Sequence, residues 1–172
     1  MKNKKCNVFL IDDNEMYCNL LEHCFQKYVG KHIQSVRTFS TGEACLKELT
    51  RSSPDIVVLD YYLDSKIPGA KNGVDILRKI KSVNRNARVI MLSSQETIDV
   101  AVNSLKLGAS DYVVKNEQAF DQLQAAVEKI SKALTLKIRL KRIKVRNIII
   151  LTAYFFLILG LIIYAKREHW EF

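Results

Sequence analysis

The chain has 172 residues, 48% of them hydrophobic, and a formal net charge of +9. The charge is uneven, because residues 1–131 hold 18 basic and 16 acidic residues whereas residues 132–172 hold nine basic and two acidic ones. A strongly basic protein suggests nucleic acid as its partner, but a basic excess confined to one terminal segment argues against that class.

The cysteines and histidines give no sign of a metal or redox centre. No two cysteines form a CxxC pair, the three histidines are scattered, and the spacing typical of zinc sites is absent. We therefore expect reduced, mostly buried thiols in a cytosolic compartment, at Cys6, Cys18, Cys24 and Cys45.

Apolar strand-type segments alternate with helical patterns along most of the chain. The predicted strands cover residues 7–11, 34–39, 56–59, 88–92 and 111–114. The predicted helices cover residues 16–25, a segment capped at Ser40 or Thr41, residues 74–80, residues 97–107, and a segment starting near Glu117. Because one helix separates successive strands, this order predicts an α/β fold with a five-stranded, doubly wound parallel sheet.

The first predicted helix is indicated by an apolar stripe at helical spacing. Its members are Met16, Leu20, Leu21, Cys24 and Phe25. A stripe of this kind is the face that a helix packs against a core, and Gly30 ends the pattern.

Polar side chains follow the carboxyl ends of four predicted strands. They are Asp12 and Asp13 after the first strand, Asp60 after the third, Ser93 after the fourth and Lys115 after the fifth. Each alone has an ordinary explanation as a turn, a helix cap or a surface charge. In open parallel sheets, however, sites form at the carboxyl ends of the strands, so the five together favour a functional site.

Three converging carboxylates repel each other unless a cation is present, and oxygen ligands of this kind suit Mg²⁺. A carboxylate at such a site can act as a nucleophile towards phosphorus and form an aspartyl phosphate. A hydroxyl and an ammonium group are then natural ligands for the phosphoryl oxygens.

Residues 7–130 resemble the receiver domain of response regulators in two-component signalling systems, which has a flavodoxin-like fold. The resemblance rests on the acidic pair at 12–13, on Asp60 and Ser93, and on the segment GASDYVVK at 108–115. It implies that Asp60 accepts a phosphoryl group from the phosphohistidine of a histidine kinase. It also implies that Mg²⁺ is bound by Asp13, Asp60 and the backbone carbonyl of Tyr62, with Asp12 acting through water. Lys115 would bind the phosphoryl group, and Ser93 and Tyr112 would form the switch pair.

Two features depart from the family pattern. Asn116 stands where a proline usually follows the lysine, so we expect the lysine to be held less rigidly. The loop at 61–73 is longer than usual, with its proline and glycine at Pro68 and Gly73 and with Asp64 in the usual proline position. We expect this longer loop to alter dephosphorylation or the access of partners to the site.

An uncharged run of 18 residues, 148–165, lies near the end of the chain. As a helix it is about 27 Å long, close to the roughly 30 Å of a bilayer's hydrocarbon core, and its position excludes a signal peptide. We predict a transmembrane helix, with a buried core helix as the alternative. Six basic residues at 137–146 precede the run and only Lys166 and Arg167 follow, so residues 1–146 should be cytoplasmic and 166–172 outside.

The predicted organisation is therefore a receiver domain at 1–131, a basic juxtamembrane helix or linker at 132–147, a transmembrane helix at 148–165 and a short extracytoplasmic tail at 166–172. No glycine or proline occurs from 117 to 159, which favours one continuous helix, although the alternation at 137–146 also suits a strand. Apolar residues at 120–134 recur every three or four positions. This spacing is compatible with a short parallel coiled coil and also with packing of one helix face on the sheet.

These features predict a membrane-anchored, single-domain response regulator in the inner, cytoplasmic membrane. We expect it to catalyse only its own phosphorylation and dephosphorylation, and to have no DNA-reading output domain. Expected partners are a histidine kinase or phosphotransfer protein, an output protein, anionic lipid headgroups and a second copy of the chain. A phosphorylation-independent membrane adaptor is the alternative, and a nucleic-acid binder using 137–146 is disfavoured because that segment lacks aromatic residues.

Overall fold

The computed structural model of the protein describes residues 5–63, 72–94 and 98–168, with side chains up to residue 164. The chain divides into two units, Met1–Lys132 and Ala133–Phe172.

The first unit is a five-stranded parallel sheet in the order β2-β1-β3-β4-β5. The strands are β1 (Cys6–Ile11), β2 (Ile33–Phe39), β3 (Ile56–Asp60), β4 (Arg88–Ser93) and β5 (Asp111–Val114). The helices are α1 (Glu15–Tyr28), α2 (Gly42–Glu48), α3 (Gly73–Val83), α4 (Ile98–Lys106) and α5 (Ala119–Glu168). The predicted α/β fold with a doubly wound parallel sheet is confirmed.

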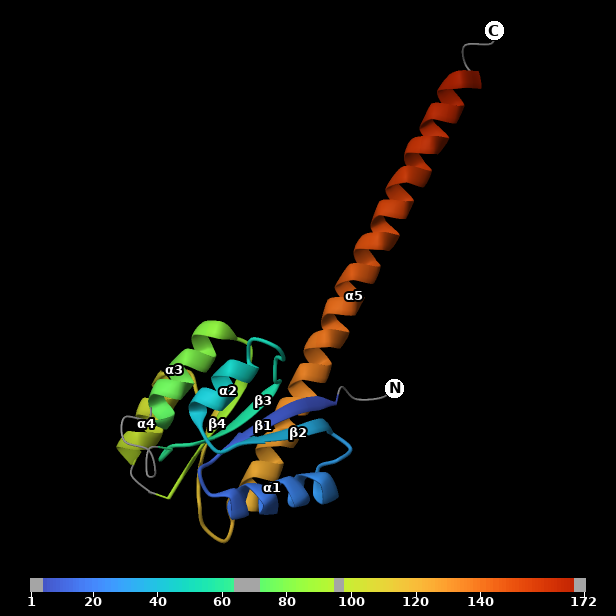
Figure 1. Cartoon of the computed structure of the whole chain (residues 1–172). Coiled ribbons are helices and arrows are strands. Elements are labelled where there is room, and N and C mark those ends of the chain that lie inside the picture. Colours follow the sequence, from blue (N-terminus) through green and yellow to red (C-terminus); the bar gives the residue numbers. More distant parts are fainter. Residues whose placement is uncertain (1–4, 64–71, 95–97, 169–172) are drawn as a thin grey trace. The chain divides into compact units, whose positions relative to one another are not determined.

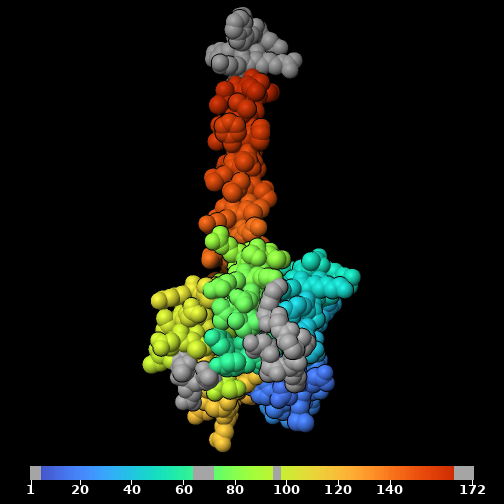
Figure 2. Space-filling view, turned by 60° about the vertical axis from the view of Figure 1, so that its left-hand side comes forward, coloured from blue at the N-terminus to red at the C-terminus, as the bar shows by residue number. Residues whose placement is uncertain are grey.

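Helices cover both faces of the sheet (Figure 1). The helices α2, α3 and α4 lie on one face, and the space-filling view of that side shows α3 in green between α2 in cyan and α4 in yellow (Figure 2). The core on this side includes Phe9, Ile11, Val57, Leu59, Ile76, Leu77, Ile80, Val89 and Met91. All five residues of β3 are buried, as expected for a central strand covered on both faces.

Side-chain caps fix where three of the helices begin. The side-chain oxygens of Asn14, Thr41 and Asn72 accept hydrogen bonds from backbone N–H groups in the first turns of α1, α2 and α3. The cap expected at position 40 or 41 is therefore Thr41. The helix α4 is followed by Gly108, whose φ of +99° lies in the region that favours glycine.

The predicted apolar face of α1 is partly wrong. Met16 is 81% exposed and Leu20 is 56% exposed, whereas Cys18, Leu21 and Phe25 are buried. Apolar residues occupy a wide arc of this helix, so more than one stripe has helical spacing, and packing on the sheet selects the stripe that is buried. The resulting rotation of α1 about its axis also places Tyr17 towards the carboxyl ends of the strands, where its ring lies near Lys115.

The helix α5 continues from the first unit into the second. The segment 137–146 is helical, so the alternative of a strand there is wrong. Among the described residues one helix is long and apolar enough, by length and composition, to cross a membrane, with a mean hydropathy of 2.4 over its most apolar window. The side chains of 148–164 are exposed, unlike those of a core helix.

Candidate functional site

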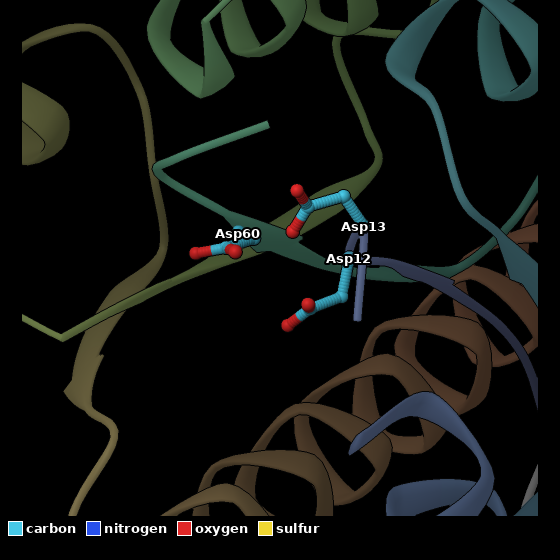
Figure 3. Close-up of side chains that lie close together, drawn as sticks. All are labelled: Asp12, Asp13 and Asp60. Atoms are coloured by element: carbon cyan, nitrogen blue, oxygen red, sulfur yellow. The ribbon is translucent and has the colours of Figure 1, made fainter. Parts of the chain in front are cut away.

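Three aspartates converge at the carboxyl ends of β1 and β3. The nearest carboxylate oxygens of Asp12, Asp13 and Asp60 all lie within 4.8 Å of one another (Figure 3). Asp12 and Asp60 are each only 3% exposed. The neighbours β1 and β3 lie where the strand order reverses, which is the usual position of a site in an open α/β sheet.

Lys115 joins this cluster from the end of β5. Its Nζ lies 2.7 Å from Oδ2 of Asp12 and 2.8 Å from Oδ2 of Asp60. Burial acts to lower the pKa of Lys115, but hydrogen bonds to the two carboxylates outweigh it and raise the pKa above its ordinary value. The side chain therefore stays an ammonium ion between two acidic groups.

Asp60 is held through both of its carboxylate oxygens. Its Oδ2 accepts from Lys115, and its Oδ1 accepts from the backbone N–H of Tyr62 at 3.3 Å. Burial raises the pKa of Asp60, and the hydrogen bond from Lys115 opposes that rise without cancelling it. The carboxylate is thus buried, oriented and accompanied by one positive charge.

The two predicted switch residues lie on neighbouring strands. Ser93 is the last residue of β4 and is fully buried. Tyr112 pairs with Met91 across β4 and β5, and its half-buried side chain packs against the core. The backbone carbonyl of Ser93 also accepts a hydrogen bond from the N–H of Lys115 at 2.7 Å. The strands β4 and β5 therefore bring Ser93 and Lys115 to the same edge of the sheet.

Only the two ends of the loop after Asp60 belong to the described residues. Asp64 and Pro68, singled out in the sequence, lie outside the described residues. Gly73 closes the loop, because its N–H donates to the carbonyl of Tyr61 at 3.0 Å. A Cβ at this position would overlap the backbone oxygen of Asp60, so only glycine fits here.

Asn116 supplies hydrogen bonds where the family pattern has a proline. Its N–H donates to the carbonyl of Val114 at 2.9 Å, and its Oδ1 accepts from the N–H of Gln118 at 3.0 Å. The turn after Lys115 is therefore tied to its own backbone through this residue.

Three residues near the cluster were not identified from the sequence. Asn14 donates its backbone N–H to Oδ1 of Asp12 at 2.9 Å, and Cys18 donates its thiol to the carbonyl of Asp12 at 3.7 Å. Tyr17 presents its ring to Lys115, with 5.0 Å between Nζ and the ring centroid. Burial, with a smaller contribution from Asp12, raises the pKa of Cys18 to about 12, so this thiol is neutral. The signal in the sequence is their position in the first turn after the acidic pair.

Comparison with known proteins identifies the class to which this fold and site belong. Residues 8–128 match the response regulator receiver domain, and the chain belongs to this family. Proteins of the family are phosphoacceptors that interact with histidine kinases or phosphotransfer proteins and use Mg²⁺ at an acidic pocket.

Among its relatives, the chain is similar to sporulation initiation phosphotransferase F of Bacillus subtilis. The two are 31% identical over 129 residues, which are 75% of this chain and 94% of that protein. Identity to the transcriptional regulatory protein ZraR of Escherichia coli is 26% over 129 residues, and identity to MalR of Bacillus subtilis is 28% over 121 residues. The chain spans only 27% of ZraR and 48% of MalR.

Solved structures share the fold. A signal receiver domain from Vibrio parahaemolyticus superposes with a TM-score of 0.67 at 24% identity, covering 79% of this chain and 97% of that chain. The BeF3-activated receiver domain of DrrB, a protein of Thermotoga maritima, superposes with a TM-score of 0.62 at 25% identity, covering 74% of this chain and 98% of that chain.

Proposed function

We propose that this protein is a membrane-anchored receiver that takes a phosphoryl group on Asp60 from the phosphohistidine of a histidine kinase or phosphotransfer protein. The observation that carries the proposal is the pairing of Asp60 with Lys115 inside the three-carboxylate cluster. A phosphorylation-independent adaptor needs neither the ammonium group nor the acidic cluster, so the intact site favours the receiver.

In the transfer step an oxygen of Asp60 attacks the phosphorus atom and a new P–O bond forms. The P–N bond to the donor histidine breaks, and its electron pair leaves with the imidazole nitrogen. Mg²⁺, when bound by Asp13, Asp60 and the backbone carbonyl of Tyr62, offsets the charge of the carboxylates and the phosphoryl oxygens. The remaining charge is met by Lys115 and the hydroxyl of Ser93, and Asp12 acts through water.

The experiment that tests this function is the intact mass of the full chain after incubation with Mg²⁺ and a small phosphodonor. We expect a gain of one phosphoryl group, and none when Mg²⁺ is removed by a chelator. The chain is expected to turn over its own phosphate rather than a separate substrate. A chain that gains no mass under these conditions would not be a phosphoacceptor.

Mg²⁺ should stabilise the receiver through the acidic cluster. A ligand that binds only the folded state at ten times its Kd adds about 1.4 kcal/mol, which raises the melting temperature of a domain of this size by roughly 5 °C. The melting temperature should therefore rise with millimolar Mg²⁺ in the wild type and much less in Asp13→Ala. The control Asp99→Ala removes an exposed carboxylate on α4 and should keep the full shift. Equal shifts in all three chains would exclude the cluster as the metal site.

Ser93 should couple phosphorylation to a change at β5 and α4. After phosphorylation its hydroxyl is drawn to the phosphoryl oxygens and the ring of Tyr112 turns inward, so the face formed by α4, β5 and α5 changes. We expect Ser93→Ala to accept phosphate but to show less than about half of the wild-type change in the amide NMR shifts of β5 and α4. The control Ser131→Ala, another fully buried serine, should respond as the wild type does. A full response from Ser93→Ala would rule out this coupling.

The anchor is proposed from the second unit, in which exposed apolar side chains at 148–164 follow six basic residues at 137–146. We propose that the apolar run spans the cytoplasmic membrane with the receiver in the cytoplasm, and that the basic residues lie among anionic headgroups. The tether would raise the effective concentration of the receiver near membrane-bound kinases. The output is then a protein partner, or a second copy of the chain, that binds the phosphorylated state.

A further inference from the structure

Tyr17 contacts the site from a helix that carries none of the predicted site residues. It lies in the first turn of α1, and its ring centroid is 5.0 Å from Nζ of Lys115. Cation–π contacts occur within about 6 Å and strengthen when the cation is desolvated. The side chain of Lys115 is only 17% exposed, so its ammonium group is largely shielded from solvent at this contact.

A chain of hydrogen bonds sets the position of Tyr17. Oδ1 of Asp12 accepts from the N–H of Asn14 at 2.9 Å, and Oδ1 of Asn14 accepts from the N–H of Tyr17 at 3.1 Å. Lys115, beside the ring, returns to Oδ2 of Asp12 at 2.7 Å. The contacts form a closed circuit that begins and ends on Asp12, so the acidic pair and the start of α1 together place the ring against the ammonium group.

We propose that Tyr17 is a positioning residue that holds the ammonium group of Lys115 at Asp12 and Asp60. A lysine side chain is a point charge on a flexible four-carbon stem, and ordering it costs rotamer entropy. The carboxylates attract its nitrogen from one side, and the aromatic face supplies a further attractive wall. The inference rests on the proposed phosphoryl transfer, and it explains how Lys115 is held although Asn116 replaces the usual proline.

The aromatic face, rather than the phenol, provides this contact. Burial raises the pKa of the Tyr17 hydroxyl, so the phenol stays neutral, and the attraction comes from the ring quadrupole. A phenylalanine keeps that face, whereas a leucine fills similar space without it. These two substitutions therefore separate the ring from simple packing.

The first experiment measures the rate of phosphorylation of the full chain by a small phosphodonor with Mg²⁺. We expect Tyr17→Leu to slow phosphorylation about three- to tenfold and Tyr17→Phe to restore the rate to within about twofold of the wild type. The matched control is Tyr28→Leu, because Tyr28 lies on the same helix with Lys27 Nζ also 5.0 Å from its ring, away from the site. The control should keep the wild-type rate.

A double-mutant comparison tests whether the effect passes through Lys115. In a Lys115→Ala background, Tyr17→Leu should cause no further slowing, because the group that the ring positions is gone. Equal slowing with and without Lys115 would overturn the proposal and assign Tyr17 to the general packing of α1.

An NMR measurement on the unphosphorylated chain separates this inference from the proposed function. With isotope-labelled lysine, the methylene protons next to Nζ of Lys115 should be shifted upfield by the ring in wild type and Tyr17→Phe, and not in Tyr17→Leu. Identical shifts in all three chains would refute the contact itself. Failure of the wild type to accept phosphate would instead refute the proposed function, whatever the shifts.

Discussion

An Asp60→Asn chain is expected to gain no phosphoryl group under conditions in which the wild type gains one. The amide has nearly the shape of the carboxylate but is a very poor nucleophile, so the rate should fall by more than about a hundredfold. Intact mass after incubation with Mg²⁺ and a small phosphodonor measures the loss. The control Asp75→Asn changes a half-exposed aspartate that pairs with Arg78 in α3, and it should label as the wild type does.

The fold should survive this change, which keeps the result interpretable. Asp60 lies buried beside the carboxylates of Asp12 and Asp13, and removing one of three like charges relieves repulsion. We expect Asp60→Asn to melt no lower than the wild type in the absence of Mg²⁺. Labelling of Asp60→Asn at the wild-type level would move the phosphoacceptor to another residue.

Removal of residues 133–172 is expected to release the receiver completely from the membrane. The first unit, Met1–Lys132, contains the whole sheet and its core, so a chain ending at Lys132 should fold and be soluble. The full chain should stay in the membrane fraction after a carbonate wash. Recovery of the full chain in the wash would reduce the apolar run to a peripheral helix and remove the tether from the proposed function.

A substitution within the apolar run gives a sharper test than truncation. Leu157→Arg combined with Ile158→Arg puts two charges near the centre of 148–165, each costing about 2.5–3.5 kcal/mol on insertion. This variant should move largely to the soluble or carbonate-extracted fraction. The control is a chain that ends at Ala165, which lacks only the polar tail and should remain in the membrane.

The strands were predictable because their signal is local. A short run rich in apolar and β-branched residues and bounded by polar residues predicts a strand without knowledge of its neighbours. Residues 111–114 form β5 as predicted, although only Val113 in this edge strand is buried. The convergence of Asp12, Asp13, Asp60 and Lys115 also follows from the sequence, because all strands of a parallel sheet end at the same edge. Neither result needs knowledge of how the helices pack.

The sequence by itself determined the alternating order of strands and helices and the edge at which the site forms. It favoured a continuous helix through 137–146 but left a strand open there, and the structure decided for the helix. Only the tertiary structure decided which stripe of α1 is buried, since Met16 and Leu20 share the helical period with the residues that pack on the sheet. The same packing brought the ring of Tyr17 next to Lys115, although the two residues lie near opposite ends of the first unit's sequence. Periodicity specifies that a helix has an apolar face, but its rotation is set by side chains that meet it from distant parts of the chain.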